Sequence, residues 1–147
     1  RRQRQMCIRD RRYLEAIPEM FICADFSHFT CVAEGTMEHM DAYRKMMDVA
    51  IDRTRHVHAR GGWMHAPQVP DPRVEPFLEW TERFEGWWDR MIEVCLAEGR
   101  PWLTINPEFG PFTYQPIDPH SGEPLADIWE ICLWITQRFR DRWKGRL

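Results

Sequence analysis

The chain has 147 residues, of which 44% are hydrophobic and 29% charged, with a formal net charge of −3. This composition is ordinary for one soluble globular domain, and the lack of a basic surplus argues against a nucleic-acid partner. No segment approaches the roughly 18 consecutive apolar residues that a membrane span needs, so no membrane partner is expected.

The first eleven residues differ in character from the rest of the chain. The first ten, RRQRQMCIRD, resemble a translated sequencing adapter, and we interpret residues 1–11 as an artefact rather than as protein sequence. Residues 1–10 carry four arginines and one aspartate, so removing them takes the net charge from −3 to −6. The domain proper, residues 12–147, is therefore expected to be acidic and to begin inside its fold.

Apolar runs and apolar residues at helical spacing alternate along the remainder of the chain. Short apolar or alternating runs predict three strands, at Met20–Ala24, Arg55–Ala59 and Trp102–Asn106. Apolar residues three and four apart predict three helices: one at about Gly35–Arg53, one within Pro72–Glu98 and one at about Leu125–Trp143. Glycine and proline mark the long loops Arg60–Arg73 and Pro107–Pro124.

The alternation of strands and helices predicts an α/β fold with a parallel sheet and right-handed crossovers. A doubly wound open sheet and a part of a closed barrel would both give this order. No glycine-rich phosphate loop follows any predicted strand, so a nucleotide cofactor is disfavoured. We expect one domain without internal repeats.

Potential metal ligands follow each predicted strand. Asp25 and His28 follow the first strand, His58 lies near the end of the second, and Glu108 follows the third. Each alone has an ordinary explanation, since an aspartate after a strand is more often a helix cap. Because the carboxyl ends of parallel strands share one edge, the set predicts an oxygen and nitrogen site for Mn²⁺, Mg²⁺, Co²⁺ or Zn²⁺. No thiolate is expected at a matching position, which disfavours a structural zinc site.

Other polar residues lie close to this edge. His56 and His58 point to the same side of their strand; His58, nearer the carboxyl end, is the better ligand, and His56 supports it or fills the core. Arg60 is a candidate for an anionic or hydroxyl group of a substrate, with a salt bridge to a loop acid as the alternative. His65 and Gln68 could reach the same edge, but we expect them to be loop residues without a chemical role.

The cysteines form no regular framework. Apart from Cys7 in the adapter-like segment, the chain contains Cys23, Cys31, Cys95 and Cys132, with no CxxC pair. This pattern fits reduced thiols and predicts a cytoplasmic protein.

Three segments together resemble the xylose-isomerase-like TIM barrel family, in its sugar phosphate isomerase/epimerase branch. They are CADFSHFTCVAEG (Cys23–Gly35), HVHARGGWMHAPQVPDPR (His56–Arg73) and LTINPEFGPFTYQP (Leu103–Pro116), followed by LADIWEICLW (Leu125–Trp134). The resemblance covers nearly everything after the adapter-like segment. It implies the C-terminal part, about three βα units, of a (β/α)₈ TIM barrel, because a whole barrel needs about 250 residues.

The resemblance also assigns roles to residues. Asp25, His58 and Glu108 are similar to the metal ligands on the last three barrel strands, and Glu108 also to a catalytic acid/base. His28, in the DxxH motif, is similar to a catalytic residue that hydrogen-bonds substrate oxygens. Arg60 is only loosely similar to a substrate-binding arginine. The family's first ligand, a glutamate on the fifth strand, would lie before residue 12.

The resemblance implies a divalent-metal-dependent sugar or sugar-phosphate isomerase or epimerase that transfers a proton through an enediolate. Because the fifth-strand glutamate is a ligand and a catalytic group, this chain alone is expected to bind metal poorly and to be inactive. An inosose-dehydratase-like lyase and a non-catalytic sugar-binding relative are alternatives. A related apurinic endonuclease is disfavoured by the acidic charge balance.

Overall fold

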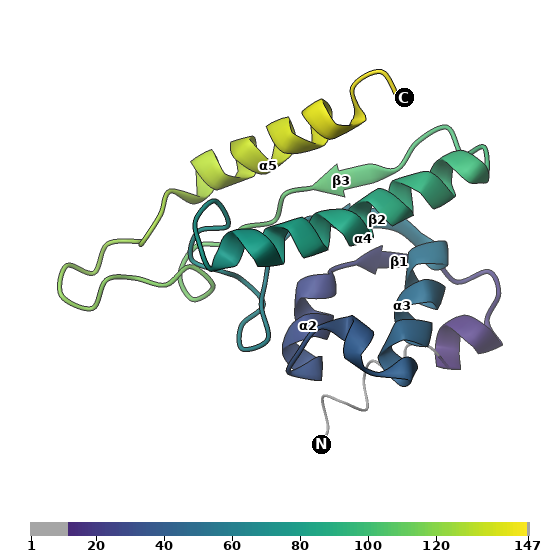
Figure 1. Cartoon of the computed structure of the whole chain (residues 1–147), viewed down its shortest axis with the longest axis horizontal. Helices are drawn as coiled ribbons and strands as arrows, with labels where there is room; N and C mark the ends of the chain where they lie inside the picture. Colours follow the sequence, from purple (N-terminus) through teal and green to yellow (C-terminus); the bar gives the residue numbers. More distant parts are fainter. Residues whose placement is uncertain (1–11, 147) are drawn as a thin grey trace.

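The computed structural model describes residues 12–146, and the predicted adapter-derived segment, residues 1–11, lies outside the described residues. The centre of the fold is a parallel sheet of three strands, in the order β1 (Ile22–Ala24), β2 (Thr54–His58) and β3 (Thr104–Asn106). Residues 12–16 are helical. The helices after β1 are α2 (Phe26–Ala33), the 3₁₀ helix η1 (Met37–His39), α3 (Asp41–Arg53), α4 (Phe77–Ala97) and α5 (Ile128–Trp143). The predicted mixed α/β architecture with a parallel sheet is confirmed (Figure 1).

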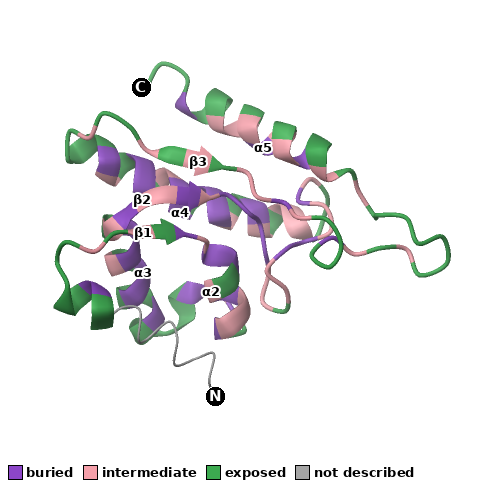
Figure 2. Cartoon of the chain, turned by 180° about the vertical axis from the view of Figure 1, so that it is seen from behind, coloured by how far each residue is buried: buried purple, intermediate pink, exposed green. Residues whose placement is uncertain are grey.

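The two faces of the sheet differ in what covers them. Helices α3 and α4 lie against one face, and α5 runs beside β3 (Figure 1). The view from behind shows the strands in front of α4 (Figure 2). Side chains alternate along a strand, so Ala24 and Val57, which are about 1% exposed or less, face the helices. Their neighbours Cys23, His56 and Thr104, paired in register across the three strands, face the other way.

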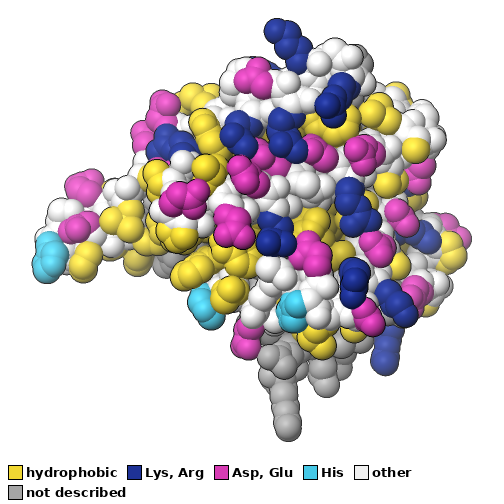
Figure 3. Space-filling model, viewed as in Figure 1, with side chains coloured by type: hydrophobic (Ala, Val, Ile, Leu, Met, Phe, Trp, Pro, Cys, Tyr) yellow, Lys and Arg dark blue, Asp and Glu magenta, His cyan; other side chains and the backbone are white. Residues whose placement is uncertain are grey.

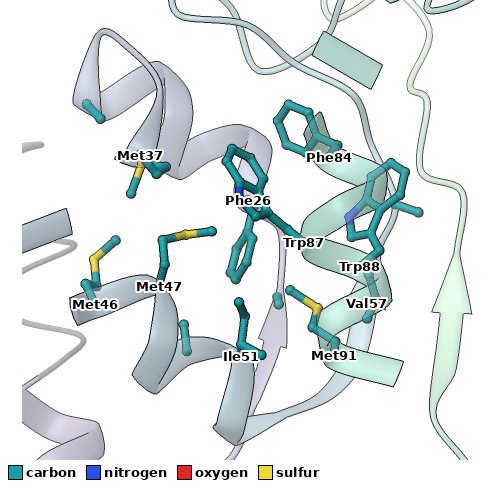
Figure 4. Close-up of a cluster of buried hydrophobic side chains, with 14 of the residues drawn as sticks. Phe26, Met37, Met46, Met47, Ile51, Val57, Phe84, Trp87, Trp88 and Met91 are labelled. Carbon is teal, nitrogen blue, oxygen red and sulfur yellow. The ribbon is translucent and has the colours of Figure 1, made fainter. Parts of the chain in front are cut away.

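The hydrophobic core fills the space between the sheet and the helices. Phe26 stacks on Phe29. Phe26 also meets Trp87 edge to face, and Phe84 contacts both Trp87 and Trp88 (Figure 4). Methionines and aliphatic residues complete the cluster: Met37, Met46, Met47, Ile51, Val57 and Met91. Burial of so much apolar surface on one side fixes which face of the sheet the helices cover.

The predicted helices are present, but their starts were misplaced. Residues 34–36 are not helical, and α3 begins only at Asp41, whereas the prediction began at Gly35. The last helix begins at Ile128, three residues later than predicted, because the Asp127 side chain accepts hydrogen bonds from the backbone N–H of Trp129 and Glu130. Helix α2 was missed altogether; it starts directly after β1 and ends at Glu34, whose φ of 52° is left-handed.

An ion-pair network joins α4 to α5. Glu85 of α4 is 4% exposed and accepts hydrogen bonds from Arg138 Nε and Nη2 at 2.6 and 2.8 Å and from Arg142 Nη1 at 3.3 Å. Asp89 accepts hydrogen bonds from Arg142 Nη2 and from the Trp143 indole. On the helix-covered face, acidic and basic side chains are interspersed (Figure 3). This network holds α5 against α4, together with the burial of Ile131 and Ile135 and the contact between the rings of Trp88 and Phe139.

None of the described helices is both long enough and apolar enough to cross a lipid bilayer.

Candidate metal centre

Three predicted ligands meet at the carboxyl ends of the strands. Asp25 follows β1 directly, His58 is the last residue of β2, and Glu108 lies two residues beyond β3. One ligand atom from each lies within 4.8 Å of the other two. His58 Nδ1 approaches Glu108 Oε2 to 2.6 Å. The structure thus brings together the residues that the sequence analysis selected, and their role as metal ligands stays a prediction.

The Glu108 carboxylate has one oxygen without a hydrogen-bond donor. Oε2 is buried, and among the described residues nothing donates to it in hydrogen-bond geometry, although His58 Nδ1 is close. The side chain as a whole is 39% exposed. A buried carboxylate oxygen without a well-oriented donor is costly, because it has lost its hydration; the nearest nitrogens to Oε2 are His58 Nδ1 at 2.6 Å and Arg60 Nη2 at 3.9 Å. A cation that binds at this point would remove that cost.

Asp25 has a structural role at the same position. Its Oδ1 accepts hydrogen bonds from the backbone N–H and the hydroxyl of Ser27, and so caps the N-terminus of α2. Its Oδ2 accepts a hydrogen bond from Arg60 Nη2. The ordinary explanation of this aspartate as a helix cap is therefore correct, and a metal role would have to use lone pairs that these partners leave free.

Arg60 lies in the middle of the candidate site. It is 3% exposed, donates from Nε to Ser27 Oγ at 3.3 Å, and packs over the Tyr114 ring with Cζ 4.6 Å from the ring centroid. Its Nη2 is 3.9 Å from Glu108 Oε2. The predicted alternative, a salt bridge to a loop acid, is present at the limit of ion-pair distance with Glu108, and the shorter ion pair is with the cap residue Asp25. The guanidinium thus supplies a positive charge between the two carboxylates.

His28 completes the cluster on the first turn of α2. Its Nε2 lies 2.8 Å from Arg60 Nη2 and 3.6 Å from Asp25 Oδ2, and its side chain is 48% exposed. Because a guanidinium can only donate, Nε2 acts as the acceptor and the ring proton sits on Nδ1. That arrangement leaves the Nδ1–H as a donor on a side chain that is about half exposed, which suits the predicted contact with substrate oxygens.

Two further residues lie beside the site on the sheet face that the helices leave bare. Cys23, His56 and His58 each offer a ligand atom, and these atoms lie within 4.8 Å of one another. No thiolate was expected at a matching strand-end position; the Cys23 thiol, one residue before the end of β1, nevertheless lies beside the site. Burial, and to a smaller extent the nearby charges of Asp25 and Glu108, raise the pKa of the Cys23 thiol. Strand alternation could have revealed it, since Cys23 lies two residues before Asp25.

A buried pair of glutamines holds the Glu108 loop in place. Gln68 donates to the Gly110 carbonyl and to Gln115 Oε1, both at 3.0 Å, and accepts from the Gly110 N–H at 2.8 Å. Gln115 donates to the Pro70 carbonyl at 2.9 Å. Gln68 lies in a loop, as expected, but it is only 2% exposed, and its hydrogen bonds give it a structural role that the sequence did not indicate. These bonds fix the loop after β3 against the loop after β2, and so fix Glu108 relative to His58.

Gly62 allows the loop after β2 to pass close to α2. A Cβ at this position would lie 2.8 Å from the Pro67 carbonyl oxygen and 2.9 Å from Ser27 Cβ. Any larger residue would push the loop outward, and Arg60 would move away from Asp25 with it.

Comparison with known proteins gave no relative: no family model, no curated protein and no solved structure matches the chain.

Proposed function

We propose that this chain is the C-terminal part of a divalent-metal-dependent sugar or sugar-phosphate isomerase or epimerase with a xylose-isomerase-like TIM barrel. The observation that carries the proposal is the meeting of Asp25, His58 and Glu108 at the carboxyl ends of three consecutive parallel strands. In parallel α/β folds this edge is where functional groups gather.

The donor set fits a divalent cation. Two carboxylates and one imidazole match Mn²⁺, Mg²⁺, Co²⁺ or Zn²⁺, with the carboxylates favouring the harder ions. Glu108 Oε2 is buried and has no hydrogen-bond donor among the described residues, so a bound cation would compensate its charge. His58 Nδ1 is already 2.6 Å from it, so these two ligands need little rearrangement.

The chemistry divides between the cation and the chain. When bound, a divalent cation supplies Lewis-acid polarisation of a substrate carbonyl. Glu108 moves a proton to or from the carbon beside that carbonyl, and the exposed N–H of His28 holds a substrate oxygen. Arg60 supplies a positive charge next to the two carboxylates, and its hydrogen bonds to Asp25 and Ser27 hold it there. A fifth-strand glutamate would complete the ligand set, so the 147-residue chain should turn over no sugar by itself.

The polar face of the sheet supports the barrel part of the proposal. Cys23, His56, His58, Thr104 and Asn106 lie on the face without helices. In a doubly wound sheet a second layer of helices would cover this face, and apolar residues would be needed beneath them. Polar side chains there suit the interior of a barrel close to its mouth, where they line the substrate pocket.

One observation favours a second candidate, a sugar-binding protein without catalysis. The Arg60 guanidinium already pairs with Asp25 and lies 3.9 Å from Glu108 Oε2, so the carboxylates are partly neutralised without a metal. In such a protein these groups would hydrogen-bond sugar hydroxyls directly.

Mn²⁺ binding to the 147-residue chain, followed by the electron paramagnetic resonance of the free ion, tests the proposal. We expect weak binding by the natural chain and at least tenfold weaker binding by Glu108→Gln and Asp25→Asn, because each loses a charged ligand. Glu123→Gln, which removes the same charge from an exposed loop, should bind like the natural chain.

Absence of binding at millimolar Mn²⁺, or equal binding by all variants, would overturn the metal site and leave the sugar-binding candidate.

A further inference from the structure

We propose a second metal site on the bare face of the sheet, formed by Cys23 Sγ, His56 and His58 and selective for Zn²⁺ and similar borderline or soft ions. The site differs from the Asp25–His58–Glu108 site in its ligand chemistry and shares only His58 with it. It does not depend on the proposed isomerase activity, because the three ligands lie together whatever the chain does with sugars.

Strand pairing sets the three side chains on one patch. Cys23 of β1 is the register partner of His56 of β2, and His58 is two residues further along the same strand. Register partners in a parallel sheet point to the same face, and so do residues two apart. The ligand atoms lie within 4.8 Å of one another. Tetrahedral zinc with one sulfur and two nitrogen ligands needs separations of about 3.3–3.6 Å, which side-chain rotations can supply.

The surroundings prepare His56 for binding. Its Nδ1 hydrogen-bonds with Oγ1 of Thr104, which is the register partner of His56 in β3. When Nδ1 donates this bond, Nε2 keeps the lone pair, and the ring is held in one orientation. Metal-binding histidines commonly use such a partner on the second nitrogen. Cys23 is exposed and both histidines are half-buried, so ions can reach the patch and water can take the fourth position.

The two ligand sets should prefer different metal ions. A thiolate and two imidazoles select Zn²⁺ and softer ions, whereas two carboxylates and one imidazole favour Mn²⁺ and Mg²⁺. A neutral imidazole has one lone pair, so His58 can serve one cation at a time. Zinc at the second site therefore removes a ligand from the first, and the two metals should compete.

Co²⁺, which adopts the zinc geometry and absorbs light, tests the second site in the whole 147-residue chain carrying Cys7→Ser. We expect a thiolate-to-cobalt charge-transfer band in the near ultraviolet. The band should be absent in Cys23→Ser, and His56→Gln should bind Co²⁺ with an apparent affinity at least tenfold lower. Cys31→Ser, a half-buried thiol on α2, is the matched control and should keep the band. Zn²⁺ should abolish the band by displacement.

Two results would overturn the proposal: no thiolate band in the natural chain, or a band that survives Cys23→Ser. Alkylation mapped by mass spectrometry gives an independent reading, because Zn²⁺ should protect Cys23 and leave Cys31 reactive.

Asp25→Asn separates this proposal from the proposed function. This variant should bind Mn²⁺ at least tenfold more weakly and should keep the cobalt–thiolate band. In addition, Zn²⁺ should weaken Mn²⁺ binding at a lower concentration in the unsubstituted chain than in Cys23→Ser, where zinc can compete only at the carboxylate site. Equal competition in both chains would show that zinc occupies the carboxylate site alone.

Discussion

Replacing Arg60 by methionine should tighten Mn²⁺ binding. Arg60 Nη2 hydrogen-bonds to Asp25 Oδ2 and lies 3.9 Å from Glu108 Oε2, so its charge occupies the neighbourhood in which a cation would bind. Methionine has a similar length and no charge, and the site is half-exposed at Glu108. The substitution therefore removes a repulsion and leaves both carboxylates in place.

The size of the effect follows from the distance. Two unit charges about 4 Å apart interact by about 1 kcal/mol at the dielectric constant of water, so a divalent ion is repelled by about 2 kcal/mol. That energy corresponds to about 30-fold in affinity. Because Arg60 is only 3% exposed, screening by water is incomplete, and 30-fold is the smaller end of the expected range.

Isothermal titration with Mn²⁺ measures the change, and two controls define its cause. Arg60→Lys keeps the charge and should bind Mn²⁺ like the natural chain. Arg90→Met removes a half-exposed charge that pairs with Asp48 on the helix-covered side, and should have no effect. Weaker or unchanged Mn²⁺ binding by a folded Arg60→Met chain would refute the reasoning, and would mean that Arg60 positions Asp25 for the metal instead of competing with it.

Two further predictions concern stability, measured as the free energy of unfolding in urea. Glu85→Gln should lower the free energy of unfolding by about 2 kcal/mol, because it weakens the hydrogen bonds from Arg138 to a charged acceptor that is 4% exposed. Glu79 is exposed, so Glu79→Gln should change the free energy of unfolding by less than about 0.5 kcal/mol. Equal losses in the two variants would contradict a stabilising role for the Glu85–Arg138 pair. Asp71→Asn should lower the free energy of unfolding by about 1 kcal/mol near neutral pH. The side-chain hydrogen bond from Arg73 lowers the pKa of Asp71 below its unfolded value of about 3.9, so this contribution is present above that value and lost as the pH falls through the folded pKa. A difference between the two chains that persists in acid would contradict it.

The three strands could be predicted from sequence because each is a short apolar or alternating run that ends in polar residues. Helix α2 was missed for a physical reason: it has only eight residues, and its start coincides with the end of β1. Asp25 carries two signals at once, a helix cap and a potential ligand. The buried residues Phe26, Thr30 and Ala33 follow helical spacing, so the pattern was present but too short to stand out.

In the candidate site, some features follow from the order of the strands and others depend on contacts between residues far apart in the sequence. Strand order alone brings Asp25, His58 and Glu108 to one edge, and this could be predicted. The position of Arg60 depends on how the loop after β2 folds over α2, and the Gln68–Gln115 pair joins residues 47 positions apart. Such contacts depend on tertiary packing, and no periodic pattern in one sequence reports them.

The charge balance of the site relates Arg60 to the kind of substrate proposed. Asp25 and Glu108 carry two negative charges when ionised, and Arg60 returns one positive charge. The cluster is then one unit negative without metal and one unit positive with a divalent cation. An anionic ligand, such as a phosphorylated sugar or one whose oxygen gains charge during proton transfer, would therefore be repelled by the metal-free cluster and attracted by the loaded one. On this reasoning Arg60 does more than weaken metal binding: by cancelling one carboxylate, it lets a single divalent ion reverse the sign of the site.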